Sequence, residues 1–468
     1  MKKSLLFILV LKVSIMPLLA QHEADNWYFG YDAGITFSTV PPTFLPGSQM
    51  YAFEGCASLS DSNGNLLFYT DGTTIWARNH TVMPNGTGLN SSYTCSQSAL
   101  FIPYPGNGSL YFLFTPPDFY PGGFFCYSIV DLTLNNGYGD ITNKNTPLFT
   151  PSAEKVTALR HANGTDIWVI GHSFNNADFY SYLITSAGIN TTPVISTAGA
   201  IHSGDVQNKI GIMKASPCGD KLALTVFDTA FVELFDFDNS TGIVSNAIHL
   251  GNYLPHNIFG IYGTEFSPDG SRLYVTQEVP ALLVQYNLLA GSAAAIIASA
   301  DTIAFYNSAT RFGTLQIGPD GKIYIARYNE TFLAKVNNPN SLGTSCNFID
   351  TAIILNSGNA THGLPNYMSS YFCNINTGYA EYLFARADFN MYPNPAAKEV
   401  QISFYGTSPS TVQINLVNLF GQTIQKKIFP ILTTGKQDIE MVLQNICSGI
   451  YFVELSNGKN TLVKKLLH

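Results

Sequence analysis

The sequence predicts an all-β protein with a large repeat domain and a small second domain after it. Three observations lead to this fold class: a turn-and-strand pattern that recurs along the chain, a composition suited to short strands, and a change of strand pattern near residue 389. Only 12% of the residues are charged, whereas Tyr, Phe, Gly and Pro are plentiful. Such a composition is typical of many short strands joined by turns.

The first 20 residues have the pattern of an export signal. Lys2 and Lys3 precede an apolar run from Leu5 to Leu19, which ends next to the small residue Ala20. Because polar residues interrupt the run, and because it is shorter than the roughly 20 apolar residues that a bilayer crossing needs, we expect a cleaved signal peptide over residues 1–20 rather than a retained anchor. No later stretch is long and apolar enough to predict a transmembrane segment.

Residues 21–375 contain six copies of one pattern, in which a turn with Gly precedes a strand of alternating apolar residues. Examples are DSNGNLLFY, SPDGSRLYVT and GPDGKIYIAR, and the copies begin at Asp61, Pro105, His161, Ser216, Ser267 and Gly318. Pro presets φ for the first corner of such a turn, Asp or Asn bonds its own backbone, and Gly adopts the left-handed conformation. Successive copies lie roughly 50 residues apart, a spacing that suits one four-stranded β-propeller blade per copy.

A seventh unit is predicted from the two ends of this domain. Trp27–Phe37 and Tyr367–Phe372 both have the pattern of strands, and joining them in one blade would close the ring and cover its open edges. We therefore predict a seven-bladed β-propeller over residues 21–375, with six or eight blades as alternatives. A pair of large sandwiches is the competing fold, but it does not explain the evenly spaced turns.

After a linker at 376–388 the strand pattern restarts. Short strand-like segments separated by turn residues run from Val400 to Leu467. Six or seven short strands in about 80 residues fit an immunoglobulin-like β-sandwich, which we place at residues 389–468.

The C-terminal domain also carries specific motifs. YPNP at 392–395, VNLFGQTI at 417–424, GIYFVEL at 449–455 and a basic end resemble the type A C-terminal sorting domain that Bacteroidetes proteins use with the type IX secretion system. The resemblance implies export through the periplasm to the cell surface or medium, with the type IX machinery as partner. The residues that it assigns to the sorting signal are Tyr392, Pro393, Asn394, Pro395, Gly421, Gly449, Tyr451, Lys464 and Lys465.

The body resembles a second group, the secreted propeller-like proteins of Bacteroidetes that carry such tails. The likeness lies in NWYFG at Asn26–Gly30, EGCASLSDSNGNLLFYTDG at Glu54–Gly72, the repeats, and LPN at Leu364–Asn366. It implies a fold and a compartment but no activity.

Charge and cysteine content exclude some functions. The formal net charge of −8 and the lack of clustered Lys and Arg argue against a nucleic-acid partner. The seven cysteines form no CxxC pair, so neither a zinc site nor a redox motif is predicted, and no cofactor is expected. We expect Cys346 and Cys373 to form a disulfide, while Cys218 and Cys447 fit small buried hydrophobes.

No compact catalytic motif is present, but a composite site on a propeller channel would not need one. The loop DFDNSTG at Asp236 lacks the Gly and the distal Glu of a calcium loop, so a hairpin turn is expected there. Glu54, Glu233 and Glu265 are the acidic candidates, although their spacing does not indicate that they face one another. The basic candidates are Arg78, His80, Arg160, His161, His172, His202, His256, Arg311 and His362.

Two functions from different classes follow. The first is a secreted or cell-surface recognition or adhesion protein without catalytic activity, whose ring presents loops to a surface glycan or protein. The alternative is an extracellular propeller hydrolase or lyase with a composite His and Arg site on the central channel. The enzyme requires at least two of the His and Arg candidates to converge in one pocket.

Overall fold

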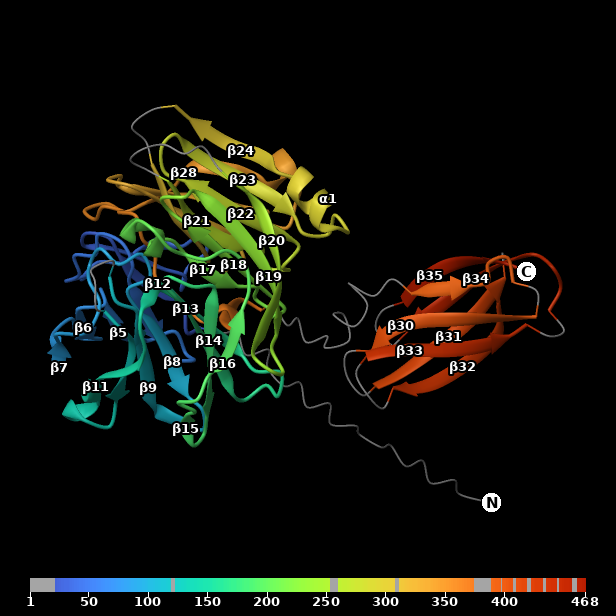
Figure 1. Ribbon diagram of the computed structural model, residues 1–468, viewed down its shortest axis with the longest axis horizontal. Helices are drawn as coiled ribbons and strands as arrows, with labels where there is room; N and C mark the ends of the chain where they lie inside the picture. Colours follow the sequence, from blue (N-terminus) through green and yellow to red (C-terminus); the bar gives the residue numbers. More distant parts are fainter. Residues whose placement is uncertain are drawn as a thin grey trace, which may run out of the picture. The chain divides into compact units, whose positions relative to one another are not determined.

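The computed structural model describes residues 22–118, 123–252, 260–307, 311–373, 389–396, 398–406, 410–418, 422–431, 435–443, 446–456 and 461–468. These residues form two compact units, a body before residue 375 and a C-terminal unit after it. In both units the regular secondary structure is mainly antiparallel strands (Figure 1). The predicted signal peptide and the predicted linker at 376–388 lie outside the described residues.

The body is a series of seven antiparallel sheets in chain order. The first three contain β1 (Asn26–Phe29), β2 (Ala33–Thr36) and β3 (Thr43–Phe44); β4 (Ala57–Ser60), β5 (Leu66–Thr70), β6 (Thr74–Ala77) and β7 (Val82–Thr87); and β8 (Leu100–Tyr104), β9 (Asn107–Thr115), β10 (Phe125–Asp131) and β11 (Asp140–Phe149). The fourth contains β12 (Ser152–Arg160), β13 (Ile167–Ser173), β14 (Asp178–Thr185), β15 (Gly188–Ile189) and β16 (Val194–Thr197).

The last three sheets of the body have four strands each. They contain β17 (Met213–Ala215), β18 (Lys221–Val226), β19 (Phe231–Asp238) and β20 (Ile243–Asn252); β21 (Ile261–Phe266), β22 (Arg272–Gln277), β23 (Ala281–Asn287) and β24 (Asp301–Tyr306); and β25 (Phe312–Ile317), β26 (Ile323–Arg327), β27 (Phe332–Val336) and β28 (Phe348–Ile354). Short helices are η1 (Asn135–Gly137), η2 (Val206–Lys209), α1 (Ala293–Ala298), η3 (Gly343–Cys346) and η4 (Ser369–Phe372).

The six predicted turns all lie between the first and second strands of a sheet. At Gly270, for example, φ is +69°, and its amide donates to Ser267 O at 2.8 Å to close the turn before β22. In the turn that begins at Pro105, the left-handed residue is Gly106, whereas Gly108 lies within β9. The repeat therefore marks the same step of each sheet, although the glycine position shifts in one copy.

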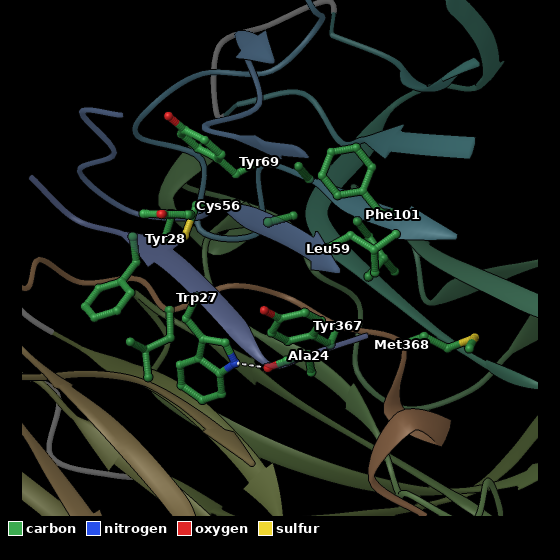
Figure 2. Packing of buried hydrophobic residues seen from close by; sticks show 14 of the residues in the cluster. Ala24, Trp27, Tyr28, Cys56, Leu59, Tyr69, Phe101, Tyr367 and Met368 are labelled. Carbon is green, nitrogen blue, oxygen red and sulfur yellow. Dashed lines mark hydrogen bonds between the residues drawn. The ribbon is translucent and has the colours of Figure 1, made fainter. Parts of the chain in front are cut away.

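Consecutive sheets pack on one another, and the series of contacts returns to its start. The first strands β4, β8, β12, β17, β21 and β25 contact one another in that order, while β28 contacts β3 and β1 contacts β4. Figure 2 shows Trp27 at this return point, with its indole N–H donating to Ala24 O at 2.8 Å. Its ring lies 6.0 Å from that of Tyr367, so the two ends of the body share one core.

The predicted closing strand at Tyr367–Phe372 is wrong. Residues 369–372 form the 3-10 helix η4, in which the Tyr371 amide donates to Met368 O at 3.0 Å and the Cys373 amide donates to Ser370 O at 3.3 Å, so the chain turns there instead of extending. The contact with the N-terminal hairpin lies earlier in the chain, where Asn359 bridges Tyr31. The Tyr367 hydroxyl also donates to Asn26 O at 3.2 Å.

The C-terminal unit consists of two antiparallel sheets around one core. The sheets contain β29 (Asn390–Tyr392), β30 (Glu399–Gly406) and β33 (Gly435–Val442), and β31 (Ser410–Asn418), β32 (Thr423–Ile431), β34 (Ile450–Ser456) and β35 (Thr461–Leu467). Alternate residues such as Ile414 and Leu416 face a shared apolar core. In the described part of the chain, no helix is long and apolar enough to cross a membrane.

Candidate functional site

Where the first strands of the body sheets meet, a buried lysine holds four segments together. Lys214 of β17 lies 3.4 Å from the Glu265 carboxylate of β21, 2.5 Å from Gln316 Oε1 of β25 and 3.4 Å from Asn366 Oδ1. Burial lowers the pKa of Lys214 and raises that of Glu265, while their attraction opposes both shifts. Beside this cluster a cavity lined by Gln97 and Asn366 has a volume of only about 10 Å³.

A group of three carboxylates lies near the starts of these first strands: Glu54 precedes β4, Glu154 is in β12, and Glu278 follows β22. The Tyr262 hydroxyl donates to Glu54 Oε2 at 2.7 Å. Burial, followed by the charges of Glu154 and Glu278, raises the pKa of Glu54 well above its usual range, against that hydrogen bond. Because Glu54 is buried close to another carboxylate, its protonated form is favoured.

Glu154 is fully buried in β12, next to a buried lysine. Its Oε2 accepts the Ser96 amide at 2.7 Å and the Ser96 hydroxyl at 2.9 Å. Burial raises the pKa of Glu154 to about 7, although these hydrogen bonds and Lys155 oppose the rise. Burial also lowers the pKa of Lys155 to about 7, and its ammonium donates to the carbonyls of Lys209 and Ile210 at 2.9 and 3.0 Å.

Two of the predicted basic residues, Arg311 and His362, meet at Tyr328. The Arg311 guanidinium lies 4.8 Å from the centre of the Tyr328 ring, and the His362 ring lies 4.3 Å from the same centre. His362 Nδ1 is 2.8 Å from Glu278 Oε1, an ion-pair distance without hydrogen-bond geometry. The ring of Phe53 packs on His362 at 5.0 Å.

Four tyrosines near this cluster form a surface that we call the tyrosine face: Tyr31, Tyr51, Tyr93 and Tyr328. The rings of Tyr31 and Tyr51 stack with centres 3.7 Å apart and planes within 6°. Burial, a hydrogen bond to Tyr51 and the other three hydroxyls raise the pKa of Tyr31, which places the four groups near one another. Tyr51 and Tyr93 are 61% and 51% exposed, so their rings are open to a ligand.

The backbone holds the tyrosine face in place. The amides of Phe53 and Glu54 donate to Tyr93 O at 3.1 and 3.0 Å, and Tyr31 exchanges two amide hydrogen bonds with Asn359, each of 2.9 Å. The His362 amide donates to Phe53 O at 3.1 Å. Segments distant in sequence are thus fixed to one another, so the aromatic rings are preorganised.

A second convergence of predicted residues is the buried pair His172 and His202. Their rings stack with centres 3.9 Å apart, and His172 Nδ1 lies 2.6 Å from Ser173 O. Burial, followed by the charge of Lys155, lowers the pKa of His172 to about 3. Burial, followed by His172 and Lys155, also lowers the pKa of His202 far below its usual range. Both rings are therefore neutral at physiological pH.

The other basic candidates lie apart from these groups. Arg78 donates to Gly137 O at 2.5 Å and His80 Nδ1 lies 3.1 Å from the Tyr69 hydroxyl. Arg160 Nη1 is 3.4 Å from Gly164 O, and His161 Nε2 is 3.1 Å from Ser240 O. The contacts of His80 and Arg160 are local, whereas those of Arg78 and His161 join turns of neighbouring sheets. His256 lies outside the described residues.

The acidic candidates do not face one another. Glu233 accepts the Ala200 amide and Glu265 pairs with Lys214, whereas the neighbours of Glu54 are Glu154 and Glu278. Glu154 and Glu278 are not among the acidic residues predicted as candidates from the sequence. A signal was available for Glu154, because the adjacent Glu and Lys side chains interrupt the apolar residues of the segment SAEKVTALR.

The predicted disulfide between Cys346 and Cys373 is wrong. Cys346 is buried beside Tyr274, whereas the Cys373 sulfur lies 2.8 Å from that of Cys218. At the Asp236 loop, the Asp238 carboxylate accepts the Ser240 amide and hydroxyl across a turn between β19 and β20. Among the described residues, no three His, Cys, Asp or Glu side chains are grouped to hold a metal ion.

Several residues assigned to the sorting signal gather around the C-terminal strand β35. Asn394 donates to Lys465 O and accepts the Leu467 amide, both at 2.9 Å. Gly449 exchanges backbone hydrogen bonds with His468 at 2.7 and 2.9 Å, and the Tyr451 hydroxyl donates to Cys447 O. Lys464 lies over the Phe389 ring.

The residues on either side of Asn394 in the YPNP motif are arranged differently from Asn394. The Tyr392 side chain is 79% exposed, and Pro393 and Pro395 both follow cis peptide bonds. Gly421 lies outside the described residues.

Comparison with known proteins identifies the C-terminal unit. Residues 390–468 match the family model described as the secretion system C-terminal sorting domain. The unit is therefore a sorting domain of that family, and it indicates secretion to the cell surface through the type IX system. No curated protein matches the chain.

The solved structures to which the chain is similar are distant in sequence. PorZ, an essential bacterial surface component of the type IX secretion system of Porphyromonas gingivalis, is 11% identical, with 95% of this chain and 59% of PorZ covered and a TM-score of 0.36. A putative 6-phosphogluconolactonase from Bacteroides uniformis is 14% identical. The match covers 83% of this chain and 100% of that protein, with a TM-score of 0.37. A functionally unknown protein from Desulfotomaculum acetoxidans is 14% identical. The match covers 72% of this chain and 96% of that protein, with a TM-score of 0.44.

Proposed function

We propose that this chain is a secreted or cell-surface recognition protein that binds a glycan at the tyrosine face without turning it over. In this proposal the seven sheets are the blades of a closed propeller, residues 1–20 are a signal peptide, and the C-terminal unit is an immunoglobulin-like sandwich. The motif residues around β35 are read by the type IX machinery of a Bacteroidetes cell.

The observation that carries the proposal is the exposed and fixed aromatic surface. The apolar face of a sugar ring stacks on an aromatic ring, and Tyr adds a hydroxyl for hydrogen bonding. Tyr51 and Tyr93 present their rings to solvent, and Arg311 stands over Tyr328 as a cation for acidic sugars. Because backbone hydrogen bonds already order the segments around Tyr31 and Tyr51, little entropy is lost on binding.

The test is titration calorimetry of the full secreted chain against neutral and acidic polysaccharides. Tyr51→Ala removes half of the ring stack, and we expect affinity to fall at least about tenfold, which corresponds to about 1.4 kcal/mol. Tyr392→Ala is the matched control, since this tyrosine is also exposed but belongs to the sorting domain. Equal binding by Tyr51→Ala and the parent chain would exclude the tyrosine face as the site.

The cluster of Glu54, Glu154 and Glu278 favours a hydrolase or lyase as the second candidate function. A buried acid with a pKa near 7 beside further carboxylates is an arrangement that enzymes use for general acid catalysis. Arg311 and His362 also both contact the Tyr328 ring, which brings together two of the basic candidates that a composite site would use.

Product analysis on the same polysaccharides separates the two candidates. New reducing or unsaturated ends that disappear in both Glu154→Gln and His362→Gln would establish the enzyme. Binding that depends on Tyr51, without product after prolonged incubation, would establish recognition.

A further inference from the structure

Cys218 and Cys373 come from distant parts of the body. Cys218 lies in the turn between β17 and β18, in the fourth copy of the repeat, and Cys373 follows η4, 155 positions later. Their sulfurs are 2.8 Å apart, and both side chains are partly exposed. No disulfide is present among the described cysteines.

The segments that carry these cysteines are fixed by other contacts. The amide of Gly219 closes its turn on Ser216 O at 2.9 Å. On the other side, η4 is tied to β12 through Ser370 Oγ, and Phe372 is buried next to Tyr367. Two ordered segments therefore bring the thiols together, so only small side-chain rotations separate them from the S–S distance of about 2.05 Å in a disulfide.

The remaining cysteines have other neighbours. Cys126 lies 3.0 Å from the Thr115 hydroxyl, Cys95 lies 3.5 Å from Pro117 O, and Cys346 lies beside Tyr274. Cys447 is exposed in the sorting domain. Among the described contacts, the pair of Cys218 and Cys373 is the one in which two cysteine sulfurs meet.

We propose that Cys218 and Cys373 form a disulfide that locks the end of the body to its fifth sheet. One thiolate attacks a small-molecule or protein disulfide, forms a mixed disulfide with it and releases the first thiol of the oxidant. The second thiolate then attacks the cysteine sulfur of the mixed disulfide and displaces the second thiol of the oxidant. The two cysteines lose two electrons and two protons in total, and the oxidant is reduced to two thiols. Export supplies an oxidising compartment, and the oxidant can reach sulfurs that are partly exposed.

The bond has a structural consequence because the segment before Cys373 completes the body. Asn366 bonds to Lys214, Tyr367 packs on Trp27, and η4 contacts β12. A covalent link at Cys373 prevents the C-terminal end of this segment from separating from the rest of the body. The link also closes a loop of 155 positions, which reduces the number of conformations open to the unfolded chain.

The test uses the full chain, first reduced and then incubated with oxidised glutathione, so that its outcome does not depend on the export route. Alkylation in denaturant should modify five cysteines in the oxidised chain and seven after reduction. Digestion without reductant should give a crosslinked peptide pair that contains Cys218 and Cys373. Reduction should lower the melting temperature of the body by roughly 5–10 °C.

Cysteine variants test whether this pair causes the change in melting temperature on reduction. Cys218→Ser and Cys373→Ser should each abolish the effect of reductant on melting, whereas Cys447→Ser should retain it. Seven alkylated cysteines after oxidation, or a crosslink between Cys346 and Cys373, would overturn the proposal. A chain isolated from a periplasm with the crosslink already formed would in addition support the export on which the proposed function rests.

Discussion

The body and the sorting domain bury different kinds of side chain. Glu154, Lys155, Lys214 and Glu265 in the body are at most 4% exposed, whereas the buried side chains among the described residues of the sorting domain are apolar, as in Val400, Ile414 and Val453. Buried charges cost free energy that an apolar core avoids. The comparison indicates that an antiparallel sheet core does not need such groups, and that the body retains them where its first strands meet.

The largest expected effect is the loss of Lys214. Lys214→Met leaves the Glu265 carboxylate buried without its cation, and we expect the body to lose about 3–5 kcal/mol of unfolding free energy at pH 7. All three tryptophans, Trp27, Trp76 and Trp168, lie in the body, so urea unfolding followed by tryptophan fluorescence reports this unit alone.

A double variant sharpens this result. Lys214→Met with Glu265→Leu replaces the pair by apolar groups and should recover most of the lost stability. Lys398→Met in the sorting domain removes an exposed lysine and serves as the matched control, with less than about 0.5 kcal/mol of change. A single variant as stable as the parent chain would show that Glu265 finds another partner and that the buried pair is unimportant.

The second effect is a pH dependence that belongs to the body. The pKa of Glu154 is about 7 in the folded chain against a usual 4.5, so the folded state holds a proton that the unfolded state has released. Stability contributed by this group therefore falls as pH rises from 4.5 to 7, by about 3 kcal/mol in all. Lys155 acts in the opposite sense above pH 7, since its folded pKa of about 7 lies below the usual 10.5.

Glu154→Gln tests this dependence by removing the titrating group while keeping an acceptor for the Ser96 amide. The variant should match the parent near pH 4.5 and exceed its unfolding free energy at pH 7. Glu399→Gln, on the surface of the sorting domain, should leave the profile unchanged. Parallel profiles for the parent chain and Glu154→Gln would contradict a raised pKa at this site.

A smaller effect is expected at Asn394, within the sorting domain. Asn394→Ala removes two hydrogen bonds to β35 and should destabilise this unit by about 1–2 kcal/mol. Hydrogen exchange of the Leu467 amide measures the loss directly. Tyr392→Ala should leave exchange unchanged because this side chain is 79% exposed, and unaltered exchange in Asn394→Ala would mean that the motif does not hold the strand.

The sequence was sufficient for features that depend on local chemistry. The turn residues from Ser216 to Gly219 and from Ser267 to Gly270 predicted where strands start, and the YPNP motif predicted the sorting domain. Contacts between sheets that are distant in sequence were not predictable from spacing. Cys373 meets Cys218 and not Cys346, and Glu54 lies near Glu154 and Glu278, because these neighbours come from different sheets.

Removal of the sorting domain should have almost no effect on the stability of the body. The apolar cores of the two units consist of separate sets of residues, so a chain cut after Asp388 should show the same tryptophan-detected melting temperature to within about 1 °C. In a host with the type IX system, the same truncated chain should accumulate folded in the periplasm while the intact chain reaches the surface or medium. A truncated chain that melts earlier would show that the body relies on the tail for folding. If the two chains are equally stable and equally exported, the C-terminal domain is not the sorting signal.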